Sequence, residues 1–155
     1  MSNTLKPGSY MIESLLNGNA VHRFPTEDHS LLPKAIFLLS KGVQGHGFWD
    51  VKRTNDGGYI LAANRSPVAT IDGKLFAILL DMPPPQVWDI KLSERDGPDC
   101  FIIAERYSPR GWVANADADD DELNQISVRP LIIGPSYPPF YPPNEVFKFI
   151  RVDRD

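Results

Sequence analysis

The side chains that most often do chemistry in enzymes are scarce in this chain. It has three histidines, His22, His29 and His46, and one cysteine, Cys100. A nucleophilic triad needs a histidine beside a serine or cysteine and a carboxylate, and no nucleophile-elbow motif supplies the serine. The spacing of histidine and cysteine fits no zinc pattern. Paired carboxylates for sugar hydrolysis remain an alternative that no motif singles out, so we expect no enzyme, no metal and no cofactor.

The charge balance argues against a nucleic-acid partner. The chain has 16 Lys and Arg and 20 Asp and Glu, which gives a formal net charge of −4. The sequence has no cluster of cations for phosphate contacts. The longest charge run is Asp119-Asp120-Asp121-Glu122. It lacks the ligand order and glycine of a Ca²⁺ loop, so we interpret it as a solvated loop, with a metal site as the weaker alternative.

Cysteine usage and the N-terminus bear on the compartment. With Cys100 as its one cysteine, the chain can form no intrachain disulfide, which fits a reducing compartment. The first residues contain no apolar signal segment, and no apolar stretch is long enough to span a membrane. We therefore expect a cytoplasmic protein without a membrane partner, and a monomer.

Prolines and glycines occur along the whole chain, and their frequency predicts strands rather than helices. Fifteen prolines and 11 glycines leave little room for helix. Asn17-Gly18 and Asp72-Gly73 are strong hairpin signals, because both positions of such a turn must accept a positive φ. Short apolar runs predict about twelve strands, and the thirteen candidate segments are residues 10–15, 20–24, 35–39, 48–51, 59–62, 68–71, 74–80, 87–90, 101–105, 112–113, 126–128, 131–133 and 146–150.

An internal repeat suggests how these strands are arranged. Each third of the chain opens with an aromatic strand and closes with a buried-type aromatic, namely Trp49, Trp88 and Phe147. Three four-stranded units resemble a β-trefoil with pseudo-threefold symmetry, in which closure of the sheet removes exposed edges. We therefore predict a single all-β domain over residues 1–155, a β-trefoil of about twelve strands with these three aromatic residues in its core.

Three segments resemble a known family. They are Pro7-Gly8-Ser9-Tyr10-Met11-Ile12, the stretch from Glu27 to Lys34, and the proline-rich stretch from Arg129 to Glu145. Together they are similar to the mushroom β-trefoil serine protease inhibitors of the cospin type, which are related to cnispin and more distantly to the mycocypins. The resemblance covers nearly the whole chain. It implies a cytosolic fungal defence protein that inhibits serine proteases of the trypsin family.

In cospin-like inhibitors the loop between the second and third strands enters the protease. The resemblance places that loop between two prolines, Pro25 and Pro33, which restrict the backbone. The specificity position, which trypsin's carboxylate pocket requires to be basic, corresponds to His29. Imidazole is shorter than guanidinium and mostly neutral at pH 7, so we hypothesise that His29 weakens trypsin inhibition or redirects the specificity. The implied binding residues are Thr26, Glu27, Asp28, His29, Ser30, Leu31 and Leu32.

Other segments compete as reactive loops. Asn64-Arg65-Ser66 lies where related mushroom inhibitors contact asparagine-specific cysteine proteases or trypsin-like enzymes, and Arg110-Gly111 is another basic peptide bond. The loop from Gly134 to Asn144 contains no basic residue, so the cnispin site is not carried over. From a different class, a carbohydrate-binding lectin is the alternative, because Gln86-Val87-Trp88 matches the Gln-x-Trp feature of ricin-type lectins in one of the three repeats.

Overall fold

The computed structural model describes residues 4–23, 27, 29–40, 47–80, 84–116, 124–134, 136 and 139–152, in which short strands dominate. Two single-turn 3₁₀ helices, η1 (Glu94–Asp96) and η2 (Pro143–Glu145), accompany them. No helix in this described part of the chain is long and apolar enough to cross a membrane. The 13 strands are β1 (Gly8–Ser14), β2 (Val21–Arg23), β3 (Lys34–Leu38), β4 (Trp49–Arg53), β5 (Tyr59–Ala63), β6 (Ser66–Ile71), β7 (Lys74–Ala77), β8 (Trp88–Leu92), β9 (Cys100–Glu105), β10 (Arg110–Val113), β11 (Asn124–Gln125), β12 (Ser127–Pro130) and β13 (Phe147–Arg151).

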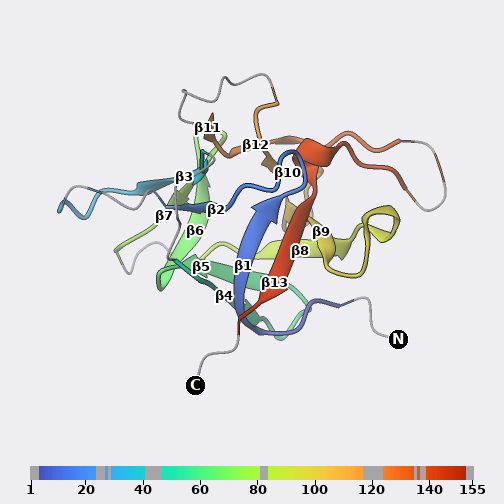
Figure 1. Ribbon diagram of the computed structural model, residues 1–155. Coiled ribbons are helices and arrows are strands. Elements are labelled where there is room, and N and C mark those ends of the chain that lie inside the picture. The colour runs from blue at the N-terminus through green and yellow to red at the C-terminus, as the bar shows by residue number, and fades with distance from the viewer. Residues whose placement is uncertain are drawn as a thin grey trace.

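The strands close into a barrel. Antiparallel pairing runs through nine of them in the order β1-β4-β5-β6-β7-β12-β10-β9-β13 and returns to β1 (Figure 1). Strand β8 lies across this ring and pairs with both β5 and β9. Strands β2 and β11 pair with β3, which joins the ring at β7. Closure of the ring satisfies the backbone groups that an open sheet would leave at its edges.

This arrangement corrects the predicted β-trefoil of about twelve strands with pseudo-threefold symmetry. The fold is all-β, with 13 strands and a closed nine-strand ring. The three units differ in pairing, because β1 and β2 meet only at an isolated Glu13–Ala20 bridge, whereas β6 and β10 pair directly with β5 and β9. The hairpins of the second and third units also join each other at Ser127 and Lys74. As a result, the β2–β3 hairpin stays outside the ring.

Aromatic side chains fill the centre of the barrel. Trp49, Trp88 and Phe147 are fully buried, which confirms their predicted place in the core. All three rings pack on a fourth, Trp112, with centroids 5.4, 5.8 and 5.8 Å away. Each large ring removes much apolar surface from water, and tilted or edge-on contacts of this kind add to that stabilisation. Cys100 is also buried, and desolvation raises the pKa of its thiol.

The hairpin signal at Asp72-Gly73 was correct, whereas at Asn17-Gly18 only Gly18 has a positive φ and the two flanking strands share one isolated bridge. At Asp72 and Gly73 the φ angles are +51° and +75°, so the β6–β7 turn has the predicted left-handed backbone. Residues 131–133, predicted as a strand, form none, because the N–H of Ile132 donates to the buried carboxylate of Glu145 instead of to a neighbouring strand. Strand β11 was not predicted from the sequence.

Candidate functional site

The β2–β3 loop extends away from the barrel. Figure 1 shows residues 29–33, in light blue beside β3, at the left edge of the molecule, beyond the closed ring. Leu31 and Leu32 are 62% and 67% exposed, and His29 is also exposed. The predicted binding residues Thr26 and Asp28 lie outside the described residues. Of the predicted loop, His29, Ser30, Leu31 and Leu32 therefore lie together on the projecting segment, whereas Glu27 lies at its base beside Arg23.

An ion pair braces the loop where it leaves β2. The guanidinium of Arg23 donates from Nη2 to Oε1 of Glu27 at 2.6 Å and from Nε to Oε2 at 3.2 Å. Its Nη1 donates to the carbonyl of Ala63 at 3.2 Å and lies 3.4 Å from the hydroxyl of Ser66. A bidentate pair of this kind has a single preferred geometry. Arg23 thus ties Glu27 to the β5–β6 turn of the barrel.

A second brace holds the other end of the loop. Lys34 is buried at the start of β3, and its Nζ donates to the hydroxyl of Ser30 at 3.1 Å. The same oxygen accepts from the N–H of Leu32 at 3.4 Å. Lys34 also pairs with Ala77 of β7 through the backbone. The segment that carries the two exposed leucines is therefore anchored to the sheet through Ser30 and Lys34.

His22 supports the base of this hairpin. It is buried, with its ring edge-on to Trp49 at 5.7 Å. Its Nε2 and Nδ1 each lie 3.4 Å from a backbone carbonyl, those of Phe48 and Arg23. Desolvation is the main cause that lowers the pKa of the imidazole, so the neutral form is favoured. His22 acts as a packing residue, consistent with the absence of a catalytic motif around it.

The alternative reactive site at Asn64-Arg65-Ser66 has a different backbone. Asn64 and Arg65 have φ angles of +48° and +71° and form a two-residue turn between the paired residues Ala63 and Ser66. Arg65 is exposed. A peptide that enters a protease cleft as a substrate must be extended, with negative φ. The Arg65–Ser66 bond therefore has the wrong local geometry for that role.

The Arg110–Gly111 bond lies inside the barrel wall. Arg110 and Gly111 pair with Pro130 and Arg129 of β12, and Gly111 is buried against β9. The guanidinium of Arg110 donates to the carbonyl of Val128 at 3.0 Å. A protease could reach this bond only if the ring opened, so the site does not offer an accessible peptide.

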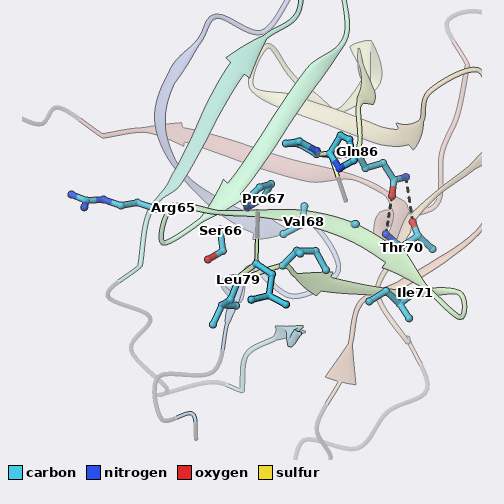
Figure 2. Close-up of a pocket in the computed structure, with 13 residues that line it drawn as sticks. Arg65, Ser66, Pro67, Val68, Thr70, Ile71, Leu79 and Gln86 are labelled. Atoms are coloured by element: carbon cyan, nitrogen blue, oxygen red, sulfur yellow. Dashed lines mark hydrogen bonds between the residues drawn. The ribbon is translucent and has the colours of Figure 1, made fainter. Parts of the chain in front are cut away.

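The Gln-x-Trp segment borders a cavity of about 270 Å³ (Figure 2). The side-chain oxygen of Gln86 accepts from the N–H of Thr70 at 2.9 Å, and its nitrogen lies 3.4 Å from the Thr70 hydroxyl and 3.2 Å from Glu105. Trp88 is fully buried and donates from Nε1 to the carbonyl of Val68 at 3.3 Å. Gln86 is thus engaged on the protein itself, bridging β6 and β9, and its amide is not directed at a ligand.

Sequence patterns did not reveal the residues that stiffen the loop. Arg23 and Glu27 are four residues apart, but that spacing indicates an ion pair only on a helix. Lys34 lay just before the predicted strand at 35–39, and no pattern marked it as an anchor of the loop. The central role of Trp112 was missed for the same reason, because only the folded barrel brings the four aromatic rings together.

The described residues define a class of protein: a small β-barrel that holds a solvent-exposed peptide segment, hydrogen-bonded at both ends, away from its wall. The model of the peptidase inhibitor I66 family matches residues 1–151, and the chain belongs to this family, in agreement with the resemblance noted in its sequence. A serine protease inhibitor of Lentinula edodes is 35% identical over 97% of this chain and 100% of its own length.

Solved structures agree with the family assignment. The structure of a proteinase inhibitor from Coprinopsis cinerea is 42% identical, covers 96% of this chain and 100% of its own, and superposes with a TM-score of 0.88. The ricin B-like lectin of Macrolepiota procera, solved with lactose, is 13% identical over 96% of this chain and 99% of its own, with a TM-score of 0.65. That likeness concerns the fold alone. The family and the relatives are named as inhibitors, which confirms the prediction that the chain is not an enzyme.

Proposed function

We propose that this protein inhibits serine proteases by placing its β2–β3 loop in the active-site cleft as a substrate would. The observation that carries the proposal is the double brace on an exposed loop: Arg23 with Glu27 at one end and Lys34 with Ser30 at the other. The family and the names of its relatives support the same activity. The lectin alternative has no comparable support, because Gln86 is engaged within the barrel.

An exposed peptide inhibits a protease well when its conformation is already fixed before binding. Ordering a free loop on binding costs roughly 0.5–1.5 kcal/mol for each immobilised side chain. Here the hydrogen bonds to Glu27 and Ser30 already exist in the unbound protein. Of the described residues, the non-glycine positions with a positive φ lie outside the loop, at Asn64, Arg65, Asp72 and Tyr107. The loop backbone is thus compatible with the extended form that a protease binds.

The finer parts of the proposal rest on the sequence. Trypsin-family enzymes are one target class, and asparagine-specific cysteine proteases, through the turn at Asn64, are a second. The backbone of Asn64 supports the second class less well, since its φ of +48° is in the left-handed region. A cytoplasmic location, argued from a chain with one cysteine, and a monomeric state complete the proposal.

Inhibition assays test the proposal directly. Purified protein is titrated against trypsin, chymotrypsin and an asparagine-specific cysteine protease, and residual activity gives an inhibition constant for each. A variant with residues 29–32 replaced by glycine and serine should fold, because the braced loop lies outside the closed ring, and should lose inhibition of the serine proteases. Retained inhibition in that variant would place the activity elsewhere on the barrel.

A further inference from the structure

The residues that project from the β2–β3 loop are apolar. Leu31 and Leu32 are 62% and 67% exposed, the highest values for leucine among the described residues. They are adjacent, and they stand on the segment that extends from the barrel in Figure 1. Ser30 and Lys34, the polar neighbours on either side, are turned toward each other and not outward. The tip of the loop therefore presents an apolar surface to a partner.

We infer that Leu31 is the specificity residue of the loop, and that the target is a serine protease with an apolar specificity pocket, of the chymotrypsin type. This inference rests on the proposed function. A hydrophobic slot receives a branched aliphatic side chain, whereas the carboxylate in a trypsin pocket requires a cation. The cation nearest to the tip in sequence, Lys34, is buried and donates to Ser30, so it is not available to such a carboxylate.

The backbone selects Leu31 over its neighbours. A substrate-like loop needs an ordinary peptide bond after the specificity residue, and the bond after Leu32 leads to Pro33, whose nitrogen has no hydrogen. Pro33 also restricts Leu32 to extended conformations. The hydroxyl of Ser30 accepts from the N–H of Leu32, which fixes the two residues around Leu31 relative to each other. The Leu31–Leu32 bond is therefore the ordinary peptide bond at the exposed tip, and the hydrogen bond to Ser30 holds it.

With this assignment, His29 is no longer the specificity residue. Its imidazole is too short to reach a carboxylate at the base of a trypsin pocket in the way that Arg does. In the register centred on Leu31, His29 lies two residues before the specificity residue and contacts the rim of the cleft. The hypothesis that His29 redirects the specificity then becomes more specific: the preferred protease has an apolar specificity pocket.

Inhibition constants for chymotrypsin and trypsin test the inference with four variants. We expect the wild type to inhibit chymotrypsin far more strongly than trypsin. Leu31→Ala should weaken chymotrypsin inhibition at least about 100-fold, because several methyl and methylene groups leave the pocket. Leu32→Ala should have a smaller effect, and Leu31→Arg should transfer inhibition to trypsin. Leu80→Ala, at another leucine that is 55% exposed, is the matched control and should change neither constant.

Prolonged incubation with chymotrypsin gives a second readout of the register. Slow hydrolysis should cut the Leu31–Leu32 bond, with water supplying the hydroxyl of the new Leu31 carboxyl group and the hydrogen of the new Leu32 amine. Mass spectrometry of the fragments identifies the bond. Cleavage after His29, or a trypsin constant that His29→Arg tightens while Leu31→Ala has no effect on either enzyme, would overturn the inference and leave serine protease inhibition standing. Inhibition of neither enzyme would overturn both.

Discussion

The brace between Arg23 and Glu27 can be removed without touching the tip of the loop. Glu27→Ala deletes both charge-assisted hydrogen bonds, at 2.6 and 3.2 Å, from side chains that are 12% and 20% exposed. The loop must then be ordered when the protease binds. At roughly 0.5–1.5 kcal/mol for each loop side chain that must be ordered again, two such side chains give a loss of binding free energy of about 1–3 kcal/mol. Such a loss weakens inhibition by about 5-fold to 150-fold.

The assay compares inhibition constants with unfolding free energies for the same proteins. Glu27→Gln retains an oxygen that can accept from Arg23 and should recover part of the inhibition. Asp89→Ala is the matched control: it breaks an ion pair of similar length and exposure, 2.6 Å from Arg106, in a cluster that joins β8 and β9. We expect it to lower stability while inhibition is unchanged.

Two results would refute this reasoning. If Glu27→Ala lowers stability but leaves the inhibition constant unchanged, the ion pair does not preorganise the loop. If Asp89→Ala weakens inhibition as much as Glu27→Ala does, the effect reflects general loosening of the barrel. In either case the rigidity of the loop would have to come from other contacts.

The remaining predictions concern the barrel. Gly111→Ala should destabilise the protein by about 2 kcal/mol or more in chemical denaturation, since a Cβ there would lie 2.3 Å from the Ile103 carbonyl. Gln86→Ala should lower stability by about 1–3 kcal/mol, because the N–H of Thr70 loses its acceptor; glycan binding abolished by this variant would contradict our interpretation. Burial raises the pKa of the Glu145 carboxyl above its ordinary value of 4.5, so the folded state holds this proton more tightly than the unfolded chain does. Its stabilising contribution is present below pH 4.5 and is lost as the pH rises through the raised pKa, so the unfolding free energy of the wild type should fall relative to Glu145→Gln over that range; parallel pH profiles in urea denaturation would contradict this.

Local sequence was a good guide to hairpins and core aromatics. The left-handed turn at Asp72-Gly73 follows from the two residues themselves, because their side chains tolerate positive φ. The burial of Trp49, Trp88 and Phe147 follows from their size and their place in apolar strands. The position of the projecting loop came from a family resemblance together with its two flanking prolines.

The loop's braces could not be predicted, since their partners are distant in sequence. Arg23 reaches Ala63 across 40 residues, and this contact exists only after β2 has been brought beside the β5–β6 turn. The exposure of Leu31 and Leu32 could not be predicted either, because an apolar pair in a sequence is more often buried than exposed.

The β-trefoil prediction was wrong, but the sequence by itself determined an all-β fold with large aromatic residues in its core. These properties follow from residue type and short-range backbone preference. Only the tertiary structure decided that nine strands close the ring, that the first hairpin stays outside it, and that its loop is stiff with leucines at its tip. Those features depend on long-range pairing and close approach, such as Gly111 against β9, and the free energies of such contacts are set by the whole fold.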